Sequence, residues 1–272
     1  MGKISDALDK YSSEKKEYLD RQYAPSERLI RTEEREIVSS QDLLQGRRFS
    51  DKLLALSSPH SITTEAFKII RGSVLYDKNK TTPKAIMVTS AFPGEGKTFV
   101  ASNLAVSFAM GLNENVLLID CDLRHPSMHE MFGIKNVYGL TEYLQEKKSI
   151  SEILIKTNIK KLTLLLAGIQ PSNPVELLSS KKMEDFIHEA KNRYHDRFII
   201  LDAAPSQLTA ETNTIANHVD GIIFVVMNGK TPRAAILQTI ENIGREKILG
   251  IVFNGSSMSY KEYNRYYKKY YR

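Results

Sequence analysis

Short aliphatic runs alternate with amphipathic segments along most of this chain. Six runs of five to seven residues are rich in Ile, Val and Leu: Ala85–Thr89, Asn115–Asp120, Leu162–Leu166, Phe198–Asp202, Gly221–Met227 and Gly250–Asn254. Runs that are apolar throughout predict strands buried on both faces of a sheet. Segments with helical spacing lie between them: Phe99–Met110, Ser151–Lys156, Met183–Tyr194, Thr209–Asn217 and Arg233–Glu246. This alternation predicts an α/β fold with a mostly parallel, twisted sheet flanked by helices.

The two ends of the chain have a different pattern. Residues 1–58 are polar and dense in charge, so we expect a largely flexible segment with a short helix near Ile4–Tyr11. A helix is predicted around Glu65–Arg71, where Thr63 or Thr64 can cap it. The predicted organisation is a flexible segment over residues 1–58, an α/β domain over 59–257 and a tyrosine-rich tail over 258–272.

Composition narrows the class of protein. The 272 residues, 42% of them hydrophobic, suit one larger α/β domain. The net charge is +6, but basic and acidic residues are interspersed, which argues against a nucleic-acid partner. A single cysteine, Cys121, allows no disulfide within the chain and fits a reducing cytosol. The sequence lacks the apolar core of a signal peptide and any run near the roughly 20 residues that span a bilayer. We therefore expect a soluble protein that reaches a membrane only through a partner.

A phosphate-binding loop is predicted directly after the first strand. Residues Ser90–Thr98 read Ser-Ala-Phe-Pro-Gly-Glu-Gly-Lys-Thr and keep the Walker A spacing, with Ala91 at the first glycine position. Glycines let the backbone turn its N–H groups towards phosphate oxygens, and the following helix offers its positive end to the same anion. We expect Lys97 to bridge the β and γ phosphates of ATP and Thr98 to bind Mg²⁺. The nucleotide-binding candidates are Pro93, Gly94, Glu95, Gly96, Lys97, Thr98 and Phe99.

Carboxylates end two later strands. Asp120 and Asp122 follow the strand that begins at Asn115, and Asp202 ends the strand that begins at Phe198 in the manner of a Walker B motif. A single such carboxylate can be a helix cap or a surface charge. Three beside a P-loop favour a magnesium site, because hard cations prefer oxygen ligands. We expect Asp202 to hold the metal, one Asp of the pair to assist, and the other to accept the proton of an attacking hydroxyl.

The C-terminal tail supplies candidate acceptors. Six of the 13 tyrosines lie there, at Tyr260, Tyr263, Tyr266, Tyr267, Tyr270 and Tyr271, and the tail has no aliphatic residue. A terminal helix or a basic aromatic patch for RNA or lipid would also fit this composition. Termini without aliphatic anchors are usually mobile, which favours a tail that a kinase can modify. Phosphorylation would add about −1.5 to −2 charges per site and reverse the charge of the tail.

Together these motifs resemble the bacterial tyrosine kinases (BY-kinases) that act with polysaccharide chain-length regulators. The resemblance covers about residues 60–272. It is carried by the P-loop, by Asp120–Pro126 (Asp-Cys-Asp-Leu-Arg-His-Pro), by Asp202–Pro205, by Gly168–Leu178 and by Gly229–Pro232. The Walker B departs from the common Asp-Thr-Pro-Pro at its two middle positions. The family's tyrosine cluster lies where this tail lies.

The resemblance implies roles for matched positions. It implies that Lys97 and Thr98 hold phosphate and Mg²⁺, that Asp122 and Asp202 support the metal, and that Asn254 faces the adenine. Asp120 is then the candidate that activates the tyrosine hydroxyl. It also implies ring assembly through a Glu-x-x-Arg-x-x-Arg helix, which here carries Glu65, Lys68 and Arg71. Lys68 keeps the charge of arginine but not its fork of donors.

The resemblance further implies partners and a cellular role. The implied partners are a membrane-anchored chain-length regulator or adaptor, other copies of the chain and a cognate tyrosine phosphatase. The implied function is tyrosine autophosphorylation between neighbouring copies, which regulates exopolysaccharide polymerisation or export from the cytoplasmic side of the inner membrane.

Two other functions stay open at this point. One is a deviant-Walker ATPase switch of the partitioning or site-selection type. Many of those proteins carry an extra lysine early in the P-loop, whereas no lysine precedes Lys97 in this loop. The other is a non-catalytic, nucleotide-binding adaptor, which the altered Walker B keeps open. Retention of Lys97, Thr98 and the three aspartates weighs against it.

Overall fold

The computed structural model describes residues 49–76, 81–193, 196–207 and 209–256. The described helices are α2 (Leu54–Ser57), α3 (Ile62–Leu75), α4 (Lys97–Ala109), α5 (Met128–Met131), α6 (Leu140–Leu144), α7 (Ile150–Ile153), α8 (Pro174–Leu178), α9 (Lys181–Arg193), α10 (Ala210–His218) and α11 (Arg233–Ile243). The strands are β1 (Ala85–Ser90), β2 (Asn115–Asp120), β3 (Leu154–Lys156), β4 (Leu162–Leu165), β5 (Arg197–Asp202), β6 (Gly221–Met227) and β7 (Ile248–Asn254). The predicted helix near Ile4–Tyr11 and the tail tyrosines lie outside the described residues.

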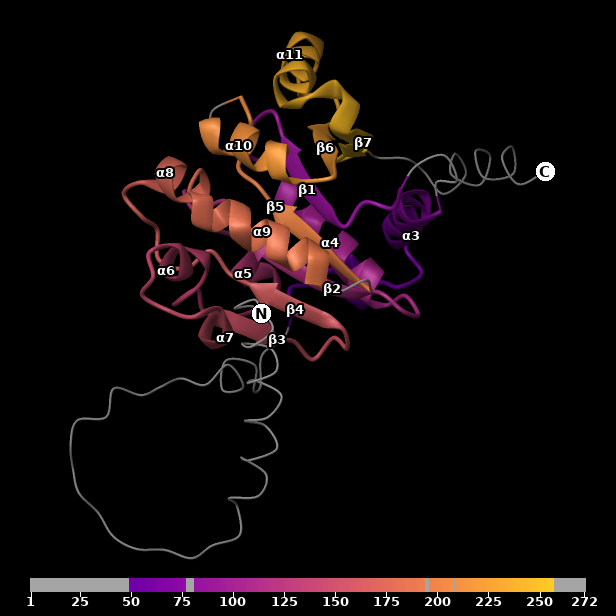
Figure 1. The fold of residues 1–272 in the computed structure, drawn as a ribbon. Coiled ribbons are helices and arrows are strands. Elements are labelled where there is room, and N and C mark those ends of the chain that lie inside the picture. The colour runs from indigo at the N-terminus through magenta and orange to yellow at the C-terminus, as the bar shows by residue number, and fades with distance from the viewer. Residues whose placement is uncertain (1–48, 77–80, 194–195, 208, 257–272) are drawn as a thin grey trace, which may run out of the picture.

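The strands form one seven-stranded sheet in the order β3-β4-β2-β5-β1-β6-β7. Every neighbouring pair is parallel except β3 and β4, which are antiparallel. Helices cover both faces, with α9 in front of the sheet and α4 behind it in Figure 1. The predicted α/β architecture with a mostly parallel sheet is confirmed.

Two hydrophobic cores lie on the two sides of this sheet. Successive residues of β1 alternate between them: Ala85 and Met87 pack with the α6–α11 side, and Ile86 and Val88 with the α2–α5 side. All four are fully buried. Burial on both faces explains why the strands read as unbroken apolar runs.

The packed domain begins earlier than residue 59. Leu53 and Ala55 are buried in the core of the α2–α5 side, and the amide of Ala55 donates to Asn103 Oδ1 at 3.0 Å. The expectation of a flexible segment is therefore wrong for residues 49–58. The four apolar residues Leu53–Leu56 follow a charged stretch, and so short a run did not mark a core segment.

Two local predictions also need correction. The predicted helix Ser151–Lys156 ends at Ile153, and Leu154–Lys156 form strand β3, because pairing with β4 satisfies their backbone groups. The cap of α3 is Ser61, whose hydroxyl accepts from the amide of Thr64 at 3.2 Å. The Thr64 hydroxyl instead donates to the Leu54 and Ser58 carbonyls.

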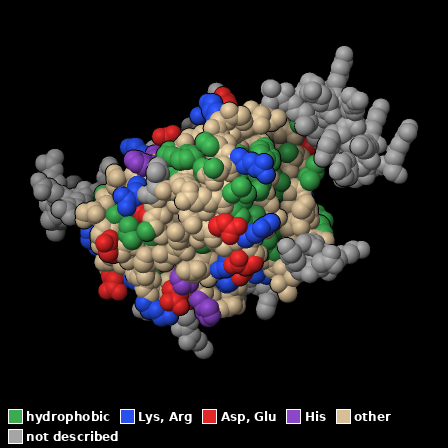
Figure 2. Space-filling view, turned by 90° about the horizontal axis from the view of Figure 1, so that it is seen from above, with side chains coloured by type: hydrophobic (Ala, Val, Ile, Leu, Met, Phe, Trp, Pro, Cys, Tyr) green, Lys and Arg blue, Asp and Glu red, His purple; other side chains and the backbone are tan. Residues whose placement is uncertain are grey.

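Charge on the surface is mixed. Figure 2 shows one face of the molecule, on which basic and acidic side chains are interspersed. Among the described residues, no helix is long and apolar enough to cross a membrane.

The topology fixes where a ligand can bind. Strands β2, β5 and β1 are neighbours at the centre of the sheet, and their carboxyl ends carry Asp120, Asp202 and the loop to α4. In open α/β sheets ligands bind outside such carboxyl ends.

Candidate nucleotide site

The loop between β1 and α4 has the geometry of an anion cradle. Gly94 and Gly96 have φ angles of 78° and 91°, which place both in the left-handed region. Glycine adopts this region without steric cost, and two such residues in quick succession bend the backbone sharply. Helix α4 begins at Lys97, so the positive end of a 13-residue helix faces the same loop.

Lys97 lies next to the acidic strand ends. Its Nζ atom is 2.8 Å from Asp122 Oδ2, and both side chains are largely buried. Burial alone would lower the pKa of Lys97, but the charges of Asp202 and Asp122 outweigh it and raise the pKa. The lysine is therefore held charged at the mouth of the loop.

Asp120 and Asp202 occupy partnered positions on neighbouring strands β2 and β5. Both are fully buried. Burial raises the pKa of Asp120 well above its usual range, and the nearby charges of Asp202 and Asp122 raise it further. Its two oxygens accept from the amides of Asp122 at 3.1 Å and Met128 at 3.2 Å, which orient the carboxyl group.

Asp202 differs from Asp120 in having no hydrogen-bond partner. Neither of its oxygens is satisfied within the described part of the chain. Burial raises its pKa to about 6, although the charge of Lys97 opposes that rise. The Thr98 hydroxyl lies near enough to favour the charged form, but the contact lacks hydrogen-bond geometry. A buried carboxylate without partners is costly, and a bound cation would relieve that cost.

These side chains fit a nucleotide phosphate with Mg²⁺. Lys97 supplies a cation, while Thr98 and Asp202 supply hard oxygen donors. Among the residues described, no group of three His, Cys, Asp or Glu side chains could hold a metal by itself. Mg²⁺ keeps several waters and takes other ligands from phosphate oxygens, so it needs few protein ligands.

Ser127 is a residue of this site that motif analysis missed. Its hydroxyl donates to Thr98 Oγ1 at 3.0 Å and so orients the candidate metal ligand. It lies just before α5, 29 residues along the chain from Thr98, and no local pattern marks it.

Two residues predicted to contact the nucleotide make contacts within the chain instead. The Phe99 ring packs against Phe67 of α3, with ring centroids 5.9 Å apart, so the ring lies against α3. Asn254 ends β7, and its side-chain amide donates to the Glu95 carbonyl at 2.9 Å. Asn254 therefore lies beside the P-loop, where it uses one of the two hydrogens on its amide nitrogen.

Arg124 has a partner that sequence reasoning also missed. Its Nε atom donates to Glu211 Oε1 at 2.6 Å. Glu211 is buried in α10, whereas the arginine is 43% exposed. The second Glu211 oxygen has no partner among the described residues. A buried carboxylate thus holds an arginine two positions after Asp122.

The helix predicted for ring assembly uses its charges within the chain. Lys68 Nζ is 2.6 Å from Glu65 Oε1, on an exposed part of α3. Arg71 donates from Nη1 to the Ser107 carbonyl of α4. Arg71 therefore fastens α3 to α4, and Glu65 and Lys68 are the more exposed charges of this set.

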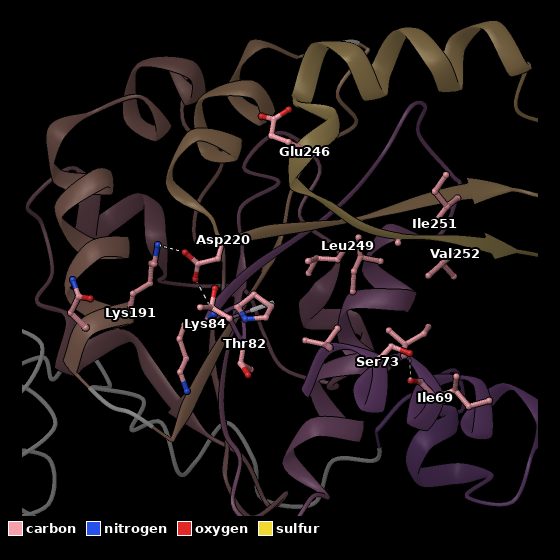
Figure 3. Close-up of a pocket in the computed structure, with 17 residues that line it drawn as sticks. Ile69, Ser73, Thr82, Lys84, Lys191, Asp220, Glu246, Leu249, Ile251 and Val252 are labelled. Carbon is pink, nitrogen blue, oxygen red and sulfur yellow. Dashed lines mark hydrogen bonds and ion pairs between the residues drawn. The ribbon is translucent and has the colours of Figure 1, made fainter. Parts of the chain in front are cut away.

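A cavity of about 1000 Å³ lies away from the P-loop (Figure 3). Ile69 and Ser73 of α3 and Leu249 and Val252 of β7 contribute to its walls. Asp220 also lines it and pairs with Lys191 at 2.5 Å. Asp220 immediately precedes β6, so the cavity lies at the amino end of the sheet, opposite the nucleotide loop.

Comparison with known proteins assigns the family. Residues 83–248 match the family model of an AAA domain. The chain is 36% identical to the tyrosine-protein kinase YwqD of Bacillus subtilis (strain 168) over 225 residues, which are 82% of this chain and 94% of YwqD. It is also 36% identical over 187 residues to the tyrosine-protein kinase CpsD of Streptococcus pneumoniae, covering 67% of this chain and 81% of CpsD.

A solved structure agrees with these relatives. The crystal structure of the chimerical protein CapA2B2 superposes with a TM-score of 0.71 at 27% identity, covering 78% of this chain and 92% of that chain. The chain belongs to the bacterial tyrosine-protein kinases. The predicted P-loop fold and tyrosine-kinase class are thereby confirmed.

Proposed function

We propose that this chain is an ATP-dependent tyrosine autokinase that phosphorylates the C-terminal tail of a neighbouring copy. The observation that carries the proposal is the grouping of Lys97, Asp120, Asp122 and Asp202 at the carboxyl ends of adjacent central strands, beside a left-handed glycine loop. The acceptors in this proposal are the six tail tyrosines from Tyr260 to Tyr271, which lie outside the described residues.

Each residue has a proposed task. The amides of the loop around Gly94–Thr98 would hold the phosphates of a bound nucleotide, and Lys97, now paired with Asp122, would supply positive charge to them. Thr98, Asp122 and Asp202 hold Mg²⁺ directly or through water. When bound, Mg-ATP supplies the phosphoryl group and neutralises the charge that develops on it. Asp120, whose carboxyl group is oriented by the amides of Asp122 and Met128, accepts the proton of the tyrosine hydroxyl.

The proposed setting is the cytoplasmic face of the inner membrane. A membrane-anchored polysaccharide chain-length regulator would hold the kinase there, and phosphorylation would regulate exopolysaccharide polymerisation or export. A cognate tyrosine phosphatase would reset the tail. These partners follow from the family resemblance, and the named relatives in its support are tyrosine-protein kinases.

Ring assembly belongs to the same proposal. Residues on α3 would contact a neighbouring copy, with Glu65 and Lys68 available at the surface. Arg71 would contribute indirectly, because it joins α3 to α4.

The predicted division of the chain keeps its tail boundary at residue 258, while the packed domain starts near residue 49.

The experiment is autophosphorylation of the full chain with Mg-ATP, followed by mass spectrometry. We expect phosphotyrosine confined to the tail, and none in Lys97→Met. ATP hydrolysis with an unmodified tail, also after addition of the cytoplasmic segment of a co-encoded adaptor, would instead support an ATPase switch. Nucleotide binding without either activity would support a non-catalytic adaptor.

A further inference from the structure

The P-loop contains an acidic side chain at its centre. Glu95 lies between the left-handed residues Gly94 and Gly96, yet the loop is built to bind an anion. Its side chain is only 4% exposed. A negative charge here would oppose phosphate binding unless local donors neutralised it.

Three donors hold the Glu95 carboxylate. Its Oε2 atom accepts from the amide of Phe92 at 2.8 Å, which closes the loop on itself. Its Oε1 atom accepts from the hydroxyl of Thr231 and from the amide of Met227 at 3.4 Å, and the same amide also donates to Thr231 Oγ1 at 3.1 Å. The side chain is thus turned towards the end of β6, 132 to 136 residues further along the chain.

The segment that Glu95 contacts is a tight turn. The amides of Lys230 and Thr231 both donate to the Met227 carbonyl, at 3.1 and 3.2 Å, and Gly229 has a φ angle of 71°. This turn contains the Gly-Lys-Thr-Pro segment of residues 229–232 and leads into α11.

The backbone of Glu95 makes a second connection. Its carbonyl accepts from Asn254 Nδ2 at 2.9 Å, and the Asn254 carbonyl accepts from the amide of Asn228 at 2.8 Å. A Cβ atom on Gly96 would overlap the Asn254 amide, so the contact is close. Glu95 therefore joins three segments: the P-loop, the turn after β6 and the end of β7.

We propose that Glu95 is a positioning residue that couples the phosphate-binding loop to the turn of residues 227–232. Bound nucleotide makes this turn more ordered, and an ordered turn raises the affinity for nucleotide. The proposal rests on the proposed nucleotide site and deepens it, because it gives the 229–232 segment a role that ATP contact alone does not require. Coupling of this kind is reciprocal: a change in the turn alters nucleotide affinity, and bound nucleotide alters the turn.

The test measures MgADP affinity by calorimetry in Thr231→Val, which removes one donor to Glu95 and leaves the P-loop sequence unchanged. We expect affinity to fall about three- to ten-fold, while Thr231→Ser, which restores the hydroxyl, binds as the unmodified chain does. Glu95→Gln should also weaken binding, because its amide group must face at least one backbone donor. Thr214→Val, the same change on α10, is the matched control.

Amide hydrogen exchange distinguishes this coupling from a role in stability alone, because a residue that only stabilises the fold would not change the protection that nucleotide gives to the turn. In the unmodified chain MgADP should slow exchange at residues 227–232, and Thr231→Val should lose this protection although its thermal midpoint stays near that of Thr214→Val. Equal affinity and equal protection in Thr231→Val and Thr231→Ser would overturn the proposal. Failure of the unmodified chain to bind MgADP would instead refute the proposed nucleotide site.

Discussion

Asp202 is a buried carboxylate without a hydrogen-bond partner among the described residues, and replacing it should stabilise the protein in a pH-dependent way. Its side chain is fully buried, and burial raises its pKa from the ordinary 3.8 to about 6. The folded protein therefore binds more protons than the unfolded chain between these pH values, and its stability falls as pH rises through that window. Asp202→Asn cannot ionise and should escape this loss.

The magnitude follows from the pKa difference. At 1.36 kcal/mol per pH unit, moving a carboxyl pKa from 3.8 to about 6 costs about 3 kcal/mol once the group is fully ionised. About 2 kcal/mol of this develops between pH 4.5 and pH 7.5. The free energy of unfolding of Asp202→Asn, relative to the unmodified chain, should thus rise by about 2 kcal/mol between these pH values. Asp120 adds to the effect, because the charge of Asp202 raises its pKa as well.

Urea unfolding followed by far-ultraviolet circular dichroism measures this difference, since the chain has no tryptophan. The samples contain EDTA and no nucleotide. Asp220→Asn is the control: burial would raise the Asp220 pKa, but Lys191 and the amides of Ala85 and Lys84 outweigh it and lower the pKa. That variant should lose about the same stability at pH 4.5 and at pH 7.5, because a lowered carboxyl pKa changes stability only as pH falls below the ordinary 3.8. If the difference for Asp202→Asn is the same at both pH values, burial does not govern Asp202 and the reasoning fails.

Three further predictions concern the surroundings of the site. Gly96→Ala should weaken ATP binding, measured by calorimetry, at least about ten-fold. The φ angle of Gly96 is 91°, and a Cβ atom there would overlap the side chain of Asn254. Unchanged affinity would contradict the proposed geometry of the phosphate-binding loop. Arg124→Ala should lower the free energy of unfolding by about 1–3 kcal/mol, since it leaves Glu211 buried without its partner, and adding Glu211→Gln should recover most of this loss. Glu142→Ala should lower the free energy of unfolding in urea by about 2–4 kcal/mol. The Glu142 carboxylate accepts hydrogen bonds from the amides of Gly139 at 2.7 Å and Ile169 at 3.2 Å. A loss below about 1 kcal/mol would show that water takes the place of the carboxylate.

Local signals in the sequence were enough for the central sheet and the nucleotide loop. Strands β1, β2, β5 and β6 are buried almost throughout, so their apolar runs are nearly unbroken, and the P-loop needs glycines at fixed spacing. Parallel strands bring their carboxyl ends to one edge, which is why Asp120 and Asp202 could be expected to meet. The kinase class needed the combination of motifs.

What could not be predicted depends on partners distant in sequence. Glu211 is 87 residues from Arg124, and Thr231 is 136 residues from Glu95. No periodicity marks such pairs, because each is set by the packing of different elements. Strand β3 was missed for a similar reason, since three residues carry no reliable period and the antiparallel partner β4 decides their conformation.

The partnered positions of Asp120 and Asp202 have a consequence for engineering this protein. Their spacing is set by the pairing of β2 with β5, about 4.8 Å between strands, and not by any loop. Changes of chain length at the amino end of β2 should therefore leave the two carboxylates in place. The turn before β2 offers such a position at Leu112, which is 93% exposed. A fluorescent tag inserted there should preserve the geometry of the two carboxylates, so it offers a way to label the protein without disturbing this edge of the sheet.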